Sequence, residues 1–329
     1  MQRFNLKKIG IGAGIIAVIV AVGFLVHRTS SFEITGMAKI AGSTASQAQA
    51  DCLHVSRRPI AVMMAGDPVT RPLAGIGQAD IVFEMPVTPG GVTRMMAVFH
   101  CQTPTLIGSI RSARKDFISL AASLGAVYAH WGGEKDALAS LNAGIIDNID
   151  ALKYEGTTFY RKGKLKPPHN GFSDLNKLID RAQQLHYSLE STMTDYPRTT
   201  VMPARSISNI ADTASIGYVA PYDVLWRYDA QVQSYVRVRN GQPEMDATTN
   251  QPVTAATVAV MQTIAHPLNE FYQDVEVVGQ GPATIYQQGV STSAVWKKST
   301  ATSRLEFVDQ TGKTIEFAPG VIWIEIVTQ

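Results

Sequence analysis

Two arginines, Arg111 and Arg114, enclose Ser112 at a point where the sequence predicts the start of a helix. Apolar residues at i, i+3, i+4 and i+7 indicate that helix, with Ser112 as a candidate N-cap and Gly125 as a candidate stop. A helix N-terminus favours negative charge, so two cations there conflict with the helix dipole. Backbone N–H groups, a hydroxyl and two guanidinium groups at one point would bind an oxyanion such as phosphate or a carboxylate. The alternative, which the sequence leaves open, is that both arginines pair with carboxylates of this chain.

Two histidines extend the candidate site. His130 closes a predicted strand, and His169 follows two prolines. An imidazole can act as a general acid or base near neutral pH, so both histidines are candidate catalytic groups. A hydrogen-bonded structural role is the alternative for each of them. The candidate ligand-binding residues are the neighbours of the histidines and the start of the helix: Trp131, Asn170, Arg111, Ser112 and Arg114.

No further catalytic or cofactor motif is present in the sequence. Spacings typical of a metal site, such as H-E-x-x-H or C-x-x-C, do not occur, so we predict no metal. The glycines between Ala74 and Ala79 are followed by no helical pattern, so we predict no dinucleotide loop and no cofactor. A G-x-S-x-G elbow is also missing, which leaves no motif for a serine nucleophile.

A buried cation is predicted in the strand at residues 92–100, which contains Arg94. A buried guanidinium needs a partner. Glu84, in the preceding predicted strand, is the obvious one. We therefore assign Glu84 and Arg94 a structural role as a pair.

The pattern of apolar residues predicts strands mixed with helices up to about residue 187, and almost only strands after Pro203. In the first part we expect strands at 59–65, 79–85, 92–100 and 126–130, and helices at 134–142 and from residue 173 onward. In the second part we expect strands at 224–228, 235–239, 257–263, 274–278, 283–286, 292–296, 304–308, 314–317 and 321–327.

The N-terminal region contains an uncharged apolar run at residues 9–26, with basic residues before it. Its helix would be about 27 Å long, enough to cross a bilayer, and the positive-inside rule keeps the N-terminus in the cytoplasm. The run is longer than the apolar part of a signal peptide, and no A-x-A cleavage site follows it. We predict a cytoplasmic tip and transmembrane signal anchor at residues 1–29, a flexible tether at 30–56, and an extracytoplasmic remainder.

Charge and cysteine content limit the partners and the compartment. The net charge of +2 over 329 residues gives no reason to expect nucleic acid as a partner. The two cysteines, Cys52 and Cys101, are predicted to form a disulfide in an oxidising compartment. Two unpaired thiols are the alternative.

Several stretches of the chain together resemble the YerB-like family of bacterial envelope proteins, from Arg57 to the C-terminus. In order, they are R-P-I-A-V-M-M with A-D-I-V-F-E downstream, G-G-V-T-R-M-M-A-V-F, G-S-I-R-S-A-R-K-D-F, K-P-P-H-N-G-F, and the run from G-Q-G-P-A-T-I-Y to F-A-P-G-V-I-W-I-E-I-V. The resemblance implies an α+β fold, a layered sandwich of two β-sheets and a helical layer. It also implies an exported, membrane-attached protein, and it carries over no biochemical activity. Several members look like lipoproteins, whereas this sequence has no lipobox.

These observations lead to a set of expectations. We expect a mixed α/β domain at residues 57–202 and a β-rich, mostly antiparallel domain at 203–329. We expect a protein at the cell membrane that binds an anionic cell-envelope polymer, or its fragments, through the arginines at the helix start. Two alternatives stay open: a hydrolase or transferase of the envelope with a histidine as general base, and a scaffold that docks a protein partner.

Overall fold

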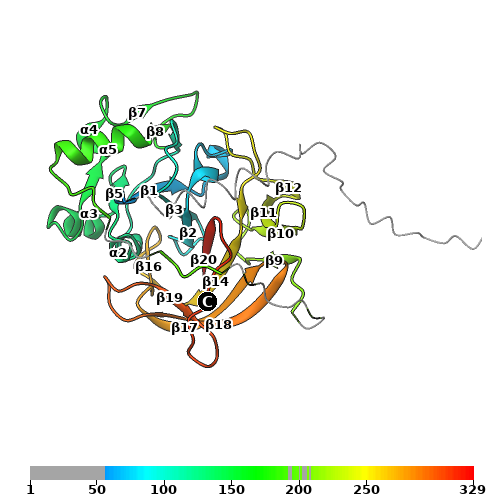
Figure 1. The fold of residues 1–329 in the computed structure, drawn as a ribbon. Helices are drawn as coiled ribbons and strands as arrows, with labels where there is room; N and C mark the ends of the chain where they lie inside the picture. The colour runs from blue at the N-terminus through cyan, green and yellow to red at the C-terminus, as the bar shows by residue number, and fades with distance from the viewer. Residues whose placement is uncertain (1–55, 192–194, 200, 202–205, 207–208) are drawn as a thin grey trace, which may run out of the picture. The chain divides into compact units, whose positions relative to one another are not determined.

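A ten-stranded sheet takes its strands from both parts of the sequence (Figure 1). The computed structural model describes residues 56–191, 195–199, 201, 206 and 209–329, all of which belong to one compact unit, Lys39–Gln329. Across the sheet, the strands are β19 (Glu306–Val308), β18 (Val290–Lys298), β17 (Gly279–Gln287), β14 (Thr257–Thr263), β20 (Ile322–Thr328), β2 (Ile81–Pro86), β3 (Thr93–Phe99), β1 (Ile60–Ala65), β5 (Val127–His130) and β6 (Asn148–Asp150).

Most strands in the middle of this sheet run in one direction. β1 is parallel to β5, β5 to β6, β2 to β20 and β20 to β14, and β1 and β2 are both antiparallel to β3. The carboxyl ends of β1, β2, β5, β6, β14 and β20 therefore meet at one edge of the sheet. Ligand sites of α/β sheets lie outside such an edge.

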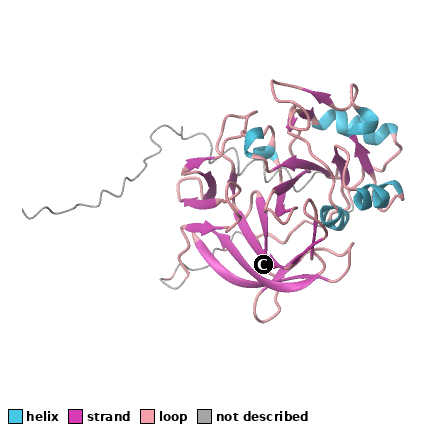
Figure 2. Ribbon diagram, turned by 180° about the vertical axis from the view of Figure 1, so that it is seen from behind, coloured by secondary structure: helices cyan, strands magenta, loops and turns pink. Residues whose placement is uncertain are grey.

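Four α-helices surround the N-terminal part of the sheet within the described chain, and the C-terminal part is built of strands and loops (Figure 2). This confirms the predicted α+β class. The helices are α2 (Lys115–Ser123), α3 (Lys135–Asn142), α4 (Ala151–Tyr154) and α5 (Leu175–Gln184), with 3-10 turns η2 (Pro68–Thr70) and η3 (Ile76–Gln78).

The start of α2 differs from the prediction, whereas its end agrees with it. Gly125 has a φ of 60°, a left-handed conformation that ends the helix after its C-cap Leu124. The N-cap is Arg114, and Ser112 does not cap the helix. Ser112 lies in an extended segment in which Arg111 N donates to Met63 O (2.9 Å) and Ala113 N donates to Gly132 O (2.8 Å). These tertiary bonds hold residues 111–113 out of the helix.

Three smaller sheets complete the described fold. One comprises β9 (Thr213–Ser215), β10 (Leu225–Asp229), β11 (Ser234–Arg239), β12 (Gln242–Pro243) and β13 (Thr254–Ala255). The second is the hairpin β15 (Ala265–Pro267) and β16 (Gln273–Val275), and the third comprises β4 (Ile107–Gly108), β7 (Tyr160–Arg161) and β8 (Gly171–Ser173). The strand predicted at 314–317 is absent from the described fold, where this segment forms only isolated bridges.

Apolar side chains of the large sheet form two cores, one on each face. On β1, Met63 belongs to the first core, while Val62 and Met64 belong to the second, as the alternation of side chains along a strand requires. Phe117 and Leu120 of α2 pack into the first core, and Leu175 and Leu178 of α5 pack into the second.

The large sheet joins the two predicted domains, because β20 lies between β14 and β2. The sheet therefore continues across the predicted domain boundary at residue 203.

Candidate functional site

Three arginines gather at the carboxyl edge of the large sheet, and we call them the arginine cluster: Arg94, Arg111 and Arg114. Arg94 stands near the start of β3, opposite Ala65 at the end of β1, and the other two lie just before and at the N-cap of α2. Their residues are only 6%, 8% and 7% exposed. Burial and the positive charges of Arg114 and Arg111 lower the pKa of Arg94 to about 9, so Arg94 is still protonated at neutral pH. The three cations thus act on one another in a buried setting.

Two carboxylates partly balance this charge. Arg111 Nη2 lies 3.3 Å from Asp67 Oδ2, and Arg114 Nε lies 3.8 Å from Glu134 Oε2. Burial raises the pKa of Glu134, and the Arg114 charge opposes that rise. The alternative interpretation of the two predicted arginines, pairing with carboxylates of the same chain, is therefore realised for each of them.

Arg94 is different, because it makes no ion pair with any described residue. Its Nε and Nη1 atoms are buried without a hydrogen-bond partner in the described structure. A buried charged donor without an acceptor is strongly unfavourable. Three guanidinium groups facing two carboxylates leave one positive charge in excess, and this excess is the chemical feature that an anion would satisfy.

Other donors around the cluster also lack acceptors within the described part of the chain. The Nε atoms of Arg111 and Arg114 and the hydroxyl of Tyr128 are buried without a hydrogen-bond partner. Burial raises the pKa of Tyr128, which keeps its hydroxyl protonated and able to donate. The ring of Tyr272 lies 5.0 Å from Arg114 Cζ, which brings the β15–β16 hairpin to the same site. Arg94, Asp67, Tyr128 and Tyr272 were not part of the predicted ligand site.

The predicted pairing of Arg94 with Glu84 is wrong, for a geometric reason. In the β2–β3 register Glu84 stands opposite Met95 and Arg94 stands opposite Met85. Neighbouring residues of a strand point to opposite faces of the sheet, so the two side chains lie on different faces. Glu84 instead accepts hydrogen bonds from Arg237, Arg239 and Thr93.

Glu84 belongs to a buried ion-pair network on the second face of the sheet. Arg237 is fully buried and contacts Glu84, Glu244 (3.0 Å) and Glu325 (2.7 Å). Arg239 also binds Glu244 at 2.8 Å. The sequence signal for this network is the alternation of Arg237 and Arg239 along a strand, which places both on one face.

The structure places His130 in the interior, away from any open substrate position. Its ring is fully buried, Nδ1 lies 2.8 Å from Gly132 O, and Nε2 lies 3.2 Å from Asn148 Oδ1. Gly132 O also accepts the hydrogen bond from Ala113 N, so His130 fixes the segment that carries Arg111 and Arg114. This geometry favours a positioning role over the predicted role as general base.

His169 is connected to the arginine cluster through the residue before it. The preceding residue, Pro168, accepts a hydrogen bond from Arg111 Nη1 at 3.1 Å. His169 Nδ1 is buried and has no partner among the described residues. Both predicted histidines are thus linked to the arginines, each through a neighbouring residue.

Trp131 and Asn170 make contacts with a fourth arginine, Arg161. Its guanidinium lies 4.2 Å from the centre of the Trp131 ring, and its Nη1 donates to Asn170 Oδ1 at 3.0 Å. Gly171 lies against the same ring, where an added Cβ would come within 2.4 Å of it. These contacts use the ring face and the amide oxygen that a ligand would need. Ser112 stays partly exposed between the two predicted arginines.

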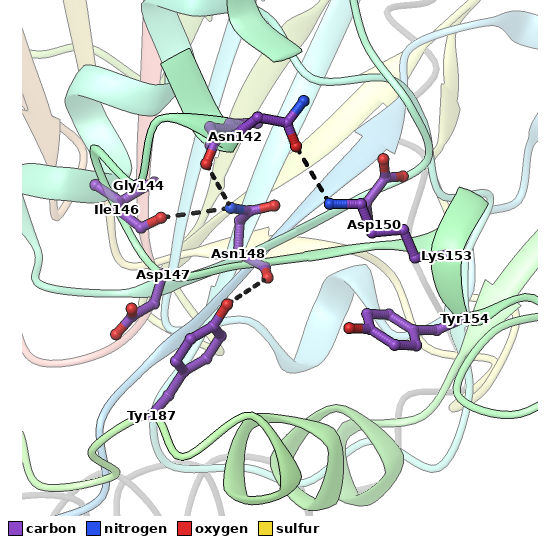
Figure 3. Close-up of a pocket in the computed structure, with 10 residues that line it drawn as sticks. Asn142, Gly144, Ile146, Asp147, Asn148, Asp150, Lys153, Tyr154 and Tyr187 are labelled. Carbon is purple, nitrogen blue, oxygen red and sulfur yellow. Dashed lines mark hydrogen bonds between the residues drawn. The ribbon is translucent and has the colours of Figure 1, made fainter. Parts of the chain in front are cut away.

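A hollow of about 290 Å³ lies elsewhere, beside β6 and α4 (Figure 3). Its wall is polar and includes Asp147, Asn148, Lys153, Tyr154 and Tyr187. Tyr187 donates to Asn148 O at 3.1 Å, and Asn148 contacts His130 from the other side. None of the three clustered arginines lines this hollow. We place the candidate site at the arginines because the unsatisfied charge is there.

Among the described residues no group of three His, Cys, Asp or Glu side chains could hold a metal ion.

Comparison with known proteins defines the class of this fold. Residues 43–188 match the N-terminal domain, and residues 214–324 the C-terminal domain, of the family described as "Protein of unknown function (DUF3048)". The chain is thus an α+β protein with both parts of that family in order. A Bacillus subtilis (strain 168) protein named "Putative lipoprotein YerB" is 29% identical over 274 residues, which are 82% of this chain and 81% of the relative.

A solved structure also matches this fold. The crystal structure of the YerB protein from Bacillus subtilis matches with a TM-score of 0.75 and 28% identity, covering 84% of this chain and 92% of that one. The chain belongs to the YerB-like family, as its motifs predicted.

The same relative contradicts the predicted single-pass localisation. It is named a lipoprotein, a protein held at the membrane by a lipid, whereas we predicted a spanning helix at residues 9–26. Those residues lie outside the described part of the chain. No helix of the described residues is long and apolar enough to cross a membrane.

The predicted disulfide between Cys52 and Cys101 stays a prediction. Cys101 is not a free cysteine, but Cys52 lies outside the described residues.

Proposed function

We propose that this protein is an extracytoplasmic envelope protein that binds an oxyanion at the arginine cluster. The observation that carries the proposal is Arg94, which is buried with two unpartnered donor atoms and no ion pair in the described chain. The name of the Bacillus subtilis relative, a lipoprotein, supports the extracytoplasmic placement. A phosphate or carboxylate group of an envelope polymer is the ligand that this charge fits.

The chemistry of the cluster suits an oxyanion in several ways. Guanidinium groups bind phosphate and carboxylate with paired, charge-assisted hydrogen bonds, and they keep their charge when buried. The Tyr128 hydroxyl adds a neutral donor. The N-terminus of α2, a helix of nine residues, adds a favourable dipole. An entering anion would compete with Asp67, whose side chain is 18% exposed and stands 3.3 Å from Arg111.

The test is a thermal-unfolding titration of the full chain with inorganic phosphate at constant ionic strength. A ligand that binds only the folded state raises the melting temperature as its concentration passes the Kd. We expect this rise for the wild type and for Arg161→Gln, which removes a cation outside the cluster. We expect no rise for Arg94→Gln or for Arg111→Gln. An equal rise in all four proteins would contradict the proposal.

A further inference from the structure

Exposed apolar side chains are concentrated on and beside one hairpin of the described chain, β15–β16. Of its ten large exposed apolar residues, four lie between residues 264 and 278: Ile264, Leu268, Phe271 and Val278. Leu268 and Phe271 are 57% and 63% exposed and stand in the tip that joins β15 to β16. Exposed apolar residues scattered singly need no explanation, whereas a group on one element suggests a binding surface.

The hairpin is fixed beside the arginine cluster. Tyr272, next to Phe271, places its ring 5.0 Å from Arg114 Cζ. Gln273 Nε2 donates a buried hydrogen bond to Pro86 O (3.0 Å), and Lys115 Nζ lies 3.7 Å from Asp274 Oδ1. α2 and β16 also pack against each other (Figure 1). The apolar tip therefore follows directly from residues that form one wall of the site.

Two other segments next to the cluster also expose a large apolar residue. Val69 follows Asp67 by two residues and is 54% exposed. Val219 is 64% exposed, and its carbonyl accepts a hydrogen bond from Tyr222 N at 2.9 Å. Burial raises the pKa of the Tyr222 hydroxyl in the same turn, and the charges of Asp67, Arg71, Arg94 and Arg111 also act on it. Buried cationic groups, with exposed apolar residues on other segments of the same region, are an arrangement that fits an amphiphile.

We infer that the ligand is a phosphate-bearing lipid, whose headgroup lies in the arginine cluster and whose apolar chain lies on the β15–β16 hairpin. The inference rests on the proposed oxyanion site and assigns it a lipid phosphate in place of a phosphate of an envelope polymer. The charges of the tip support the placement of the headgroup at the arginines and of the apolar chain at the hairpin. Glu270 lies in the tip and Glu276 follows β16, so the hairpin itself offers no net attraction for an anionic headgroup. The arginines must supply that attraction, and the hairpin supplies apolar area.

The experiment compares two probes by isothermal titration of the full chain. One is dihexanoylphosphatidylglycerol, a short-chain lipid kept below its micelle concentration, and the other is glycerophosphoglycerol, the same headgroup without acyl chains. We expect the lipid to bind the wild type about tenfold more tightly or better, because burial of each methylene group favours binding. The double variant Leu268→Ser, Phe271→Ser should lose this gain and keep its affinity for the headgroup. Arg94→Gln should lower the affinity for both probes.

A matched control removes exposed apolar residues elsewhere. Ile145→Ser, Leu152→Ser changes two residues that are 55% and 63% exposed and lie outside the hairpin, and it should bind like the wild type. Equal affinity of the wild type for both probes would overturn the lipid inference and leave the proposed function standing. Undiminished lipid binding by the hairpin variant would overturn it as well. If the wild type binds none of the three ligands, the lipid, its headgroup or inorganic phosphate, the proposed function itself is contradicted.

Discussion

Arg111 Nη2 lies 3.3 Å from Asp67 Oδ2. Arg94, another arginine of the same cluster, makes no ion pair with a carboxylate in the described structure. Burial lowers the pKa of Arg111, and the negative charge of Asp67 opposes that effect. Asp67 therefore does two things in the absence of an anion. It stabilises Arg111, and it occupies a guanidinium edge that an anion would use.

Asp67→Asn should bind inorganic phosphate more tightly than the wild type, because the competing carboxylate is gone. We expect a gain of roughly three- to tenfold, equivalent to about 0.7–1.4 kcal/mol. The same change should lower the melting temperature of the ligand-free protein, since Arg111 loses its ion pair. Phosphate titration measures the first effect and thermal unfolding the second. Asp180→Asn, at an exposed position of α5, serves as the control. Weaker phosphate binding by Asp67→Asn would show that Asp67 assists the ligand.

His130→Ala should destabilise the protein and weaken phosphate binding together. The change removes a buried ring and its contacts with Gly132 and Asn148, for which we expect a loss of about 2–4 kcal/mol. Chemical denaturation measures the free energy of unfolding, and titration measures the affinity. A fully stable variant with unchanged phosphate affinity would contradict the positioning role and return His130 to the catalytic candidates.

Asp116 should make the stability of the fold decrease as the pH rises. Burial, and then the hydrogen bond and negative charge of Asp274, raise the pKa of Asp116 to about 8. The folded state therefore binds its proton more tightly than the unfolded state does. The resulting stabilisation is complete below about pH 4 and is lost as the pH rises toward 8.

The measurement is the melting temperature of the wild type and of Asp116→Asn between pH 5 and pH 9. The variant keeps a neutral side chain at all these values, so its curve should fall less steeply than that of the wild type. Glu134 contributes to the same environment and remains in both proteins. Parallel curves for the two proteins would show that Asp116 does not titrate in this range.

Arg237→Met should be among the most damaging single changes in the chain. It leaves Glu84, Glu325 and Glu244 in the interior without their shared cation, and breaking a buried pair in this way costs about 3–5 kcal/mol. Burial alone would raise the pKa of Glu244, but Arg237 and Arg239 hold it at about 2. Arg227→Met removes an exposed arginine of β10 and should change stability little. Comparable losses in the two variants would rule out a special contribution of the network.

Local pattern was sufficient to predict several elements. The strand expected at 257–263 has those bounds as β14, and the end of α2 at Gly125 follows from a left-handed glycine. The sequence also pointed to Arg111 and Arg114, because cations at a helix start conflict with its dipole. These features depend on residues that are neighbours in the chain, and so they can be read from it.

The missing parts depend on contacts between distant residues. Nothing local indicates that β20 pairs with β2, or that Tyr272 comes to rest against Arg114. The expected Glu84–Arg94 pair failed because it relied on two strands being adjacent, without the register that sets their faces. That Arg94 has no ion pair among the described residues could be recognised only from the three-dimensional arrangement of those residues.

The most direct test of the anion site is a crystal structure of the full chain grown with tungstate, a tetrahedral oxyanion that scatters anomalously. We expect an anomalous peak among the three guanidinium groups, with an oxygen within hydrogen-bond distance of Arg94 Nε or Nη1. We expect no such peak for Arg94→Gln crystallised in the same way. Tungstate found only at exposed lysines, with no oxygen near Arg94, would contradict anion binding at the arginine cluster.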